Sequence, residues 1–220
     1  MSKRNTGQPS TGLLLLVRHA ESEWNLLGKW TGRTDVHLTD KGRQEAARLG
    51  EILQDIELHH AYTSEQIRTV ETLTHLLEGA AKTGLTHERS EHLNERDYGE
   101  YTGLNKWEVL EQLGEATFNR IRRSWDEPIP GGETLQMVHE RAVPFYKERI
   151  LPKLQKGQNV IVVSHGNTIR SLIKYLEDIS HEGIAEVEMP FGHILLYRVT
   201  EDGKHHSKEV RKIDITPPKA

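Results

Sequence analysis

The sequence predicts an α/β fold, a three-layer αβα sandwich built on a mostly parallel central sheet. Short, continuous apolar runs at residues 13–17, 61–63 and 159–163 are typical of strands that are buried on both faces. Segments with apolar residues at helical spacing separate these runs. At 220 residues the chain can fill one sizeable core, so we expect a single domain.

Each predicted element depends on a local signal. Thr39 or Asp40 can cap one helix and Ser64 the next, because their side-chain oxygens accept from the free N–H groups of a first turn. Gly79 ends the second helix, and Gly157 ends a later, long helix. In chain order we expect strand 13–17, loop 18–38, a helix from 39 or 40 through 56, strand 61–63, helix 64–79, a weaker strand 85–88, helix 134–153, strand 159–163, helix 168–176, and one or two last strands from 194.

The predicted domain covers residues 12–214. We expect residues 1–11 to form a flexible head and residues 215–220 a flexible tail. Within the domain, residues 104–132 mix glycines with short amphipathic segments, which is typical of a surface insertion that covers a site. We therefore expect a lid-like insertion there and no second core.

Composition excludes several functions. A net charge of −4 disfavours nucleic acid as a partner, because phosphate backbones select strongly basic faces. No run approaches the roughly 20 apolar residues that span a bilayer, and residues 1–11 lack a secretory signal, so we expect no membrane partner. The absence of cysteine excludes disulfides and thiolate metal sites and favours a cytoplasmic location. The adjacent pairs His59-His60 and His205-His206 do not have metal-ligand spacing, so we expect no metal.

Two predicted strands end in a similar way. The first runs into Arg18-His19, and the strand at 159–163 runs into Ser164-His165. Because ligands bind beyond the carboxyl ends of strands in open α/β sheets, both imidazoles are expected to face one crevice. A single histidine is more often a surface or satisfied core residue. Two histidines at matched strand ends indicate a site.

A phosphoryl group fits this site. Arg68 lies in the first turn of a helix that follows a strand, where the helix dipole already favours anions. With Arg18 it can surround a phosphoryl group without a metal, because guanidinium groups match phosphate oxygens. A neutral imidazole attacks phosphorus in line when a hydrogen bond to its other nitrogen fixes the tautomer. We assign that nucleophile to His19.

Longer motifs carry a resemblance to a known family. The run LVRHAESEWN at residues 16–25, with His165-Gly166-Asn167 as a second half, resembles the signature of the histidine phosphatase superfamily. Residues 93–99 and 103–106 resemble the cofactor-dependent phosphoglycerate mutases, as do Thr31-Gly32, Arg122-Arg123 and residues 130–133. The resemblance covers about residues 13–197 and implies a phosphoglycerate mutase-like fold. The sequence departs from the mutases at Ala20 and Arg33 and in a shorter segment between 123 and 130.

The resemblance also implies roles for individual residues. It implies that His19 carries the phosphoryl group, that His165 stabilises it during transfer, and that Glu95 exchanges protons with substrate hydroxyls. Arg18 and Arg68 are implied to hold the phosphate. A substrate with both a phosphate and a carboxylate needs further cations, which agrees with basic residues in the implied binding set. That set also contains Ser22, Asn25, Thr31, Gly32, Tyr98, Lys106, Arg122, Arg123, Gly166 and Asn167.

The function implied is an isomerase that interconverts 3-phosphoglycerate and 2-phosphoglycerate in glycolysis and gluconeogenesis, primed by 2,3-bisphosphoglycerate as the phosphoryl donor. Its partners would be small-molecule phosphoglycerates, with a homodimer as a further option. A phosphohistidine-dependent phosphatase for small phosphorylated metabolites is the first alternative. A catalytically silent phosphate-binding protein is the second, and the presence of both His19 and His165 disfavours it.

Overall fold

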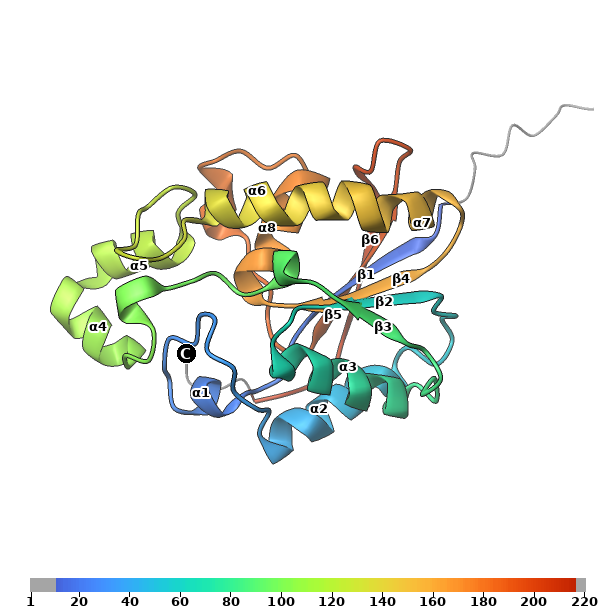
Figure 1. Ribbon diagram of the computed structural model, residues 1–220, viewed down its shortest axis with the longest axis horizontal. Coiled ribbons are helices and arrows are strands. Elements are labelled where there is room, and N and C mark those ends of the chain that lie inside the picture. The colour runs from blue at the N-terminus through green and yellow to red at the C-terminus, as the bar shows by residue number, and fades with distance from the viewer. Residues whose placement is uncertain (1–10, 217–220) are drawn as a thin grey trace, which may run out of the picture.

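A computed structural model of the chain describes residues 11–216. It contains a six-stranded sheet with helices on both faces (Figure 1). The strands are β1 (Leu13–Arg18), β2 (His60–Thr63), β3 (His87–Arg89), β4 (Val160–Ser164), β5 (His193–Val199) and β6 (His205–Lys212). The α-helices are α1 (Glu23–Leu26), α2 (Asp40–Glu51), α3 (Ile67–Gly79), α4 (Lys106–Leu113), α5 (Glu115–Arg123), α6 (Leu135–Phe145), α7 (Leu151–Gln155) and α8 (Gly166–Leu176). Shorter turns are η1 (Glu91–Leu93), η2 (Gly99–Tyr101), η3 (Tyr146–Ile150) and η4 (Gly183–Glu186).

The strand order β3-β2-β4-β1-β5-β6 confirms a mostly parallel sheet. Strands β3, β2, β4 and β1 pair in parallel, whereas β5 is antiparallel to β1 and β6 is antiparallel to β5. In the register of the central pair, Arg18 lies opposite Ser164. Because β5 runs the other way, its first residues reach the same edge of the sheet as the last residues of β1.

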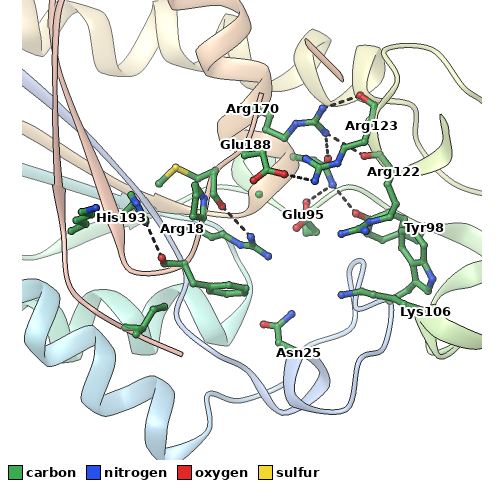
Figure 2. A pocket seen from close by; sticks show the side chains of 18 of the residues that line it. Arg18, Asn25, Glu95, Tyr98, Lys106, Arg122, Arg123, Arg170, Glu188 and His193 are labelled. Atoms are coloured by element: carbon green, nitrogen blue, oxygen red, sulfur yellow. Dashed lines mark hydrogen bonds and ion pairs between the residues drawn. The ribbon is translucent and has the colours of Figure 1, made fainter. Parts of the chain in front are cut away.

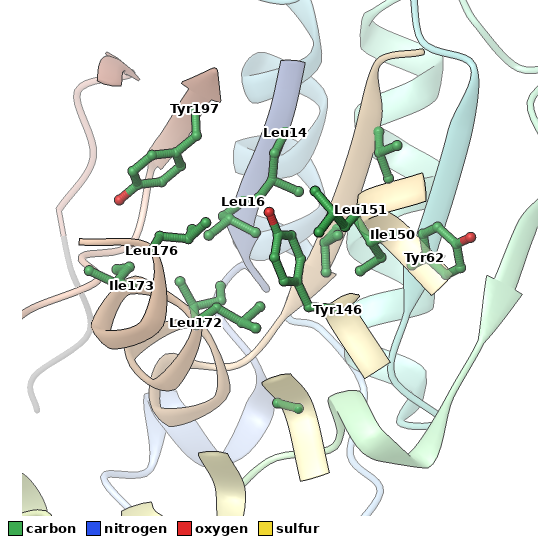
Figure 3. Packing of buried hydrophobic residues seen from close by; sticks show 14 of the residues in the cluster. Leu14, Leu16, Tyr62, Tyr146, Ile150, Leu151, Leu172, Ile173, Leu176 and Tyr197 are labelled. Carbon is green, nitrogen blue, oxygen red and sulfur yellow. The ribbon is translucent and has the colours of Figure 1, made fainter. Parts of the chain in front are cut away.

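The two faces of the sheet bury separate apolar cores, which confirms the three-layer arrangement. Leu14 and Leu16 of β1 pack under α6 and α8, and Figure 3 shows them beside Tyr146 and Leu172. The intervening Leu15 and Val17 pack against α2 and α3 on the other face. These β1 side chains are fully buried, and burial of each stabilises the fold by about 1.5–3 kcal/mol. The continuous apolar run is explained by burial on both faces.

Several element boundaries differ from the sequence prediction. The helix expected to start at Ser64 starts at Ile67 with Gln66 as its N-cap, so the assignment of Ser64 as the cap was wrong. Strand 85–88 is displaced to 87–89, and helix 168–176 begins two residues early, at Gly166. The expected loop 18–38 contains the short helix α1.

The long helix expected over 134–153 is continuous but irregular. It comprises α6, the π-helical turn η3 and α7. The N–H of Leu151 donates to the carbonyl of Tyr146, five residues back, which is the π pattern. Pro144 and Pro152 have no N–H to donate, so the regular hydrogen-bond ladder is interrupted on both sides of the turn.

Residues 104–132 lie to one side of the sheet, where α4 and α5 pack on each other (Figure 1). Four of their apolar residues, Val109, Phe118, Ile121 and Ile129, form a small cluster with Trp30, separate from the two sheet cores, whereas Trp125 packs in another cluster with residues of α6. The lid function and the single-domain boundaries remain predictions.

Most of the residues expected to be flexible, 1–11 and 215–220, lie outside the described range. Within it, Thr11 is hydrogen-bonded to Val199 and Thr216 to Lys41. Among residues 11–216, no helix has the length and apolar character to cross a membrane.

Candidate active site

Both strand-end histidines lie at one edge of the sheet. His19 follows β1 and His165 follows β4, and these strands are direct parallel neighbours. The N–H of His19 donates to the carbonyl of Ser164, which joins the two strand ends at 2.9 Å. The ring centroids of the two histidines are 5.1 Å apart. The fold therefore brings together the two imidazoles that the sequence pattern singled out.

His19 is held as a neutral imidazole. Its side chain is almost completely buried, and burial together with Arg68 and Arg18 lowers its pKa well below 6.5. Nδ1 lies 2.8 Å from the carbonyl oxygen of Ala20, which can only accept, so Nδ1 carries the proton. This leaves the lone pair on Nε2. The arrangement meets the requirement for a nucleophilic histidine.

His165 is anchored through its other nitrogen. Its Nε2 lies 2.8 Å from Oγ of Ser64, the residue that sequence reasoning had assigned to a helix cap. Burial, Arg68 and His19 lower the pKa of His165 well below its ordinary value. Its Nδ1 is buried and has no hydrogen-bond partner among the described residues. Ser64 thus orients the ring and leaves Nδ1 available to a ligand.

Two buried guanidinium groups flank the histidines. Arg68, in the first turn of α3, donates to the carbonyls of Gly32 and Thr34 at 2.9 Å each. Burial lowers its pKa to about 10, so it remains a cation at neutral pH. Arg18 donates to the carbonyl of Met189 at 3.0 Å, and its guanidinium carbon lies 3.7 Å from the ring centroid of Phe191. The Nε atoms of both arginines are buried without a partner within residues 11–216.

A cavity of about 520 Å³ opens beside these groups. Figure 2 shows Arg18 on one side of it and Lys106 and Arg122 on the other, with Asn25 below. Burial, Arg18 and Arg122 lower the pKa of Lys106 to about 8, and burial lowers that of Arg122. The sequence-predicted residues that line the cavity are Arg18, Asn25, Glu95, Tyr98, Lys106, Arg122, Arg123, Gly166 and Asn167.

Glu95 is held by contacts on its backbone and its carboxylate. Its N–H donates to Gln66 at 2.8 Å, and its Oε1 accepts from the N–H of Arg96 at 2.9 Å. Asn167 Nδ2 is 3.5 Å from the same oxygen and 2.7 Å from the hydroxyl of Tyr98. The next turn is fixed by Glu133, whose carboxylate accepts from the N–H of Asp97. Glu95 therefore faces the cavity from a rigid loop.

Four residues of the predicted binding set, Ser22, Thr31, Gly32 and Arg68, do not line the cavity, and neither do the buried His19 and His165. Ser22 is fully buried and caps α1, with its hydroxyl donating to Asn25 at 2.8 Å. The carbonyl of Gly32 accepts from Arg68 and from Gln66. Thr31 is buried in the same loop, and the carbonyl of Thr31 accepts from Thr34. In this structure Ser22 and Gly32 position Asn25 and Arg68. Direct contact with substrate remains a prediction for all four.

Sequence reasoning missed one side of the cavity. Phe191 and His193 line it from the start of β5, and Ile213–Ile215 line it from the chain after β6. The N–H of Ile213 donates to the carbonyl of Gly192 at 3.0 Å, which holds this last segment against the wall. Residues that precede an antiparallel strand lie at the same edge of the sheet as residues that follow a parallel strand. The direction of β5 would therefore have placed Phe191 and His193 at the cavity, but the sequence did not show that β5 is antiparallel.

Other missed lining residues are Trp30, Arg170 and Glu188. Glu188 forms an ion pair with Arg123 at 2.5 Å, so this arginine has a counter-ion in the cavity wall. Trp30 packs its ring 4.5 Å from that of Tyr98. Arg170 is buried in α8, where the helical pattern gave no indication of a polar role.

The site is built for an anion. Buried nitrogens of Arg18, Arg68 and His165 have no hydrogen-bond partner among the described residues, and the charges of both arginines lower the pKa of both histidines. A phosphoryl group would supply the acceptor oxygens that these nitrogens lack. The neighbouring cations Lys106 and Arg122 suit a second anionic group, so the residues fit a doubly anionic phosphorylated acid such as a bisphosphoglycerate. Within residues 11–216, no group of three or more histidine, aspartate or glutamate residues could hold a metal ion.

Known proteins resemble this chain in sequence and fold. Residues 14–210 match the histidine phosphatase superfamily (branch 1). A protein of Methylorubrum populi named 2,3-bisphosphoglycerate-dependent phosphoglycerate mutase is 42% identical over 92% of this chain and 97% of its own length. A protein of the same name from Cytophaga hutchinsonii is 41% identical over 93% and 96%.

Solved structures share the fold. Bacillus stearothermophilus YhfR superposes with a TM-score of 0.77 at 28% identity, over 89% of this chain and 94% of its own. A vanadate complex of the mycobacterial glucosyl-3-phosphoglycerate phosphatase superposes with a TM-score of 0.79 at 20% identity, over 93% and 100%. The second likeness concerns the fold alone.

Proposed function

Because the chain belongs to the histidine phosphatase superfamily (branch 1), we propose that it uses His19 as a phosphoryl carrier and interconverts 3-phosphoglycerate and 2-phosphoglycerate. The observation that carries the proposal is a second group of cations, Lys106, Arg122 and Arg123, which lines the same cavity as Arg18. Removing a phosphate requires only the phosphate cage around His19, which consists of Arg18, Arg68 and His165. Holding an intact phosphoglycerate for a second transfer requires the additional cations.

The chemistry follows from the site geometry. The lone pair on Nε2 of His19 attacks phosphorus while the bond to the substrate oxygen breaks, and the group passes to the imidazole. Arg18, Arg68 and Nδ1 of His165 donate to the oxygens on which negative charge accumulates. These donors are fixed before substrate arrives, because buried contacts hold the groups that carry them.

Glu95 is the proton handler in this proposal. In the first step its carboxylate accepts the proton of the free hydroxyl of a bound monophosphoglycerate, while that oxygen takes the phosphoryl group from the primed His19. In the second step its carboxyl returns the proton to the oxygen that departs when His19 removes the other phosphate. Its place between the two cation groups allows it to reach either hydroxyl of a three-carbon acid. Because both oxygens of the acid exchange phosphate with the same His19, the phosphate changes position when the bisphosphorylated acid shifts in the cavity between the two transfers.

A bisphosphoglycerate supplies the first phosphoryl group when it is bound. Arg18, Arg68 and His165 would hold its reacting phosphate, and Lys106, Arg122 and Arg123 would hold its other anionic groups. A cytoplasmic location and a metal-free site form part of the proposal. So does closure of the cavity by residues 104–132, which would keep water from the phosphorylated imidazole.

One assay tests the function. Interconversion of the two phosphoglycerates is measured with and without 2,3-bisphosphoglycerate, together with release of free phosphate. We expect interconversion that depends on the bisphosphate and exceeds phosphate release. Release of phosphate without interconversion would instead identify a phosphatase and overturn the proposal.

A further inference from the structure

Arg170 is a buried arginine in α8 whose hydrogen bonds join three separate segments. Its side chain is 4% exposed, and burial together with Arg123 lowers its pKa to about 10, so it remains a cation at neutral pH. Within residues 11–216 it forms no ion pair. Its hydrogen-bond acceptors are the carbonyls of Val187 (2.9 Å), Ile184 (2.7 Å), Arg123 (2.8 Å) and Arg122 (3.3 Å) and the Oδ1 of Asn167 (3.0 Å).

We propose that Arg170 is a positioning residue, which sets the substrate-binding cations and the proton handler in register with each other. The inference rests on the proposed function. Arg170 touches neither His19 nor the other histidine in the described contacts, so its influence passes through the residues that it holds.

The first connection fixes the amide of Asn167. An arginine side chain has only donors, so the atom of Asn167 that faces Arg170 must be the carbonyl oxygen. The amide nitrogen is then forced toward the cavity, where it lies 2.7 Å from Tyr98 Oη and 3.5 Å from Glu95 Oε1. Arg170 therefore determines which end of this amide meets the carboxylate of Glu95.

The second connection holds the end of α5. The last carbonyls of a helix have no partner within the helix, and here Arg170 binds those of Arg122 and Arg123. The preceding carbonyl, of Ile121, accepts from the buried Arg96 at 2.8 Å. Three consecutive carbonyls are thus fixed by two buried guanidinium groups. This sets the direction in which the side chains of Arg122 and Arg123 enter the cavity (Figure 2).

A lysine could not replace Arg170. One ammonium group has three donors on a single atom, whereas the guanidinium reaches acceptors on α5, η4 and α8 with three separate nitrogens. The change Arg170→Lys keeps the charge and removes this reach. The change Arg170→Met also removes the charge at similar length.

The test compares two ligands. Orthovanadate probes the phosphate cage alone, and 3-phosphoglycerate probes the cage together with the distant cations. We expect Arg170→Lys and Arg170→Met to lower kcat/KM for interconversion by about 10²-fold, the loss caused by misplacing bound groups by about 1 Å. The Kd for 3-phosphoglycerate should rise in calorimetry, while the Kd for orthovanadate stays at the wild-type value.

The matched control is Lys174→Met. Lys174 is one turn further along α8, is 8% exposed, and donates to a single carbonyl, that of Ile179. The Lys174→Met variant should be less stable, with unchanged affinities for orthovanadate and for 3-phosphoglycerate. If an Arg170 variant weakens both ligands equally, or neither, the positioning role is refuted.

A double-variant cycle supplies a second test, in which Arg170→Lys is the only change made at Arg170. Removal of the amide by Asn167→Ala should cost activity in the wild type and much less in Arg170→Lys, because the amide is already misdirected there. Additive losses would refute the connection. Failure of the wild type to interconvert phosphoglycerates would overturn the proposed function and would leave the two-ligand comparison to decide on Arg170.

Discussion

The ammonium group of Lys106 provides a sharp test of the site, because its charge changes within an accessible pH range. Burial and the nearby Arg18 and Arg122 lower its pKa to about 8, whereas burial lowers the pKa of Arg68 only to about 10. Burial raises the pKa of Tyr98 above its ordinary value, so Tyr98 also titrates later. Above its pKa a lysine loses its proton and its charge. Binding of an anionic substrate should therefore weaken first as the pH rises through about 8.

The magnitude follows from the loss of one charged contact. With a pKa of about 8, Lys106 is about 90% protonated at pH 7 and about 10% protonated at pH 9. A hydrogen bond to a charged group contributes about 1.5–3 kcal/mol, and this corresponds to a factor of about 10 to 150. Because about 3% of Lys106 is still protonated at pH 9.5, we expect kcat/KM for 3-phosphoglycerate to fall by about 8- to 25-fold between pH 7 and 9.5, mainly through KM.

Two variants identify the group responsible. Lys106→Arg keeps its charge over the whole range, so the alkaline decline should move to higher pH. Lys106→Met should show low kcat/KM already at pH 7 and no decline near pH 8. The measurement is kcat/KM at half-unit steps from pH 6.5 to 9.5. An unchanged alkaline decline in Lys106→Met would show that another group titrates there and would refute this reasoning.

Three further predictions concern the nucleophile, the proton handler and the core. His19→Ala should abolish both turnover and the acid-labile, alkali-stable label acquired from labelled bisphosphoglycerate, and a label of wild-type size would exclude His19 as the carrier. Glu95→Gln should slow interconversion by about 10²-fold with unchanged orthovanadate affinity, and an unaltered rate would place the proton handler elsewhere. Leu16→Ala should lower the free energy of unfolding in urea by about 2–5 kcal/mol, because the side chain is fully buried, and a loss below about 1 kcal/mol would contradict the packing described for this core.

The proximity of the two histidines and Arg68 could be predicted from sequence because each of these groups follows directly from a local element. His19 and His165 come immediately after apolar runs, and Arg68 comes in the first turn of a helix. Strand ends of a parallel sheet meet at one edge whatever the details of packing, so adjacency in space followed from the pattern alone. The strand-end argument did not place the cations of α4 and α5 at the site, and only the family resemblance indicated them.

Residues that act through tertiary contacts could not be predicted in this way. Arg170 occupies an ordinary helical position, and its acceptors belong to segments 14 to 48 residues distant or to the preceding turn. Serine commonly caps helices, yet the helix after Ser64 starts later, and the hydroxyl of Ser64 contacts His165 instead. Phe191 depends on the direction of β5, which pairing with β1 determines. In each case the partner, and not the local sequence, sets the role.

The two ends of the described chain differ in their distance from the cavity, and this has a practical consequence. Thr11 enters β1 at its amino end, so the six residues of that strand, about 20 Å of extended chain, separate it from His19. Thr216 follows directly on the wall formed by Ile213–Ile215 and is bound by Lys41 at 2.7 Å. A support, dye or fusion protein attached on the carboxyl side would therefore lie close to the cavity wall. Attachment on the amino side keeps it farther from the cavity, which makes it the better choice for immobilised enzyme and for sensors.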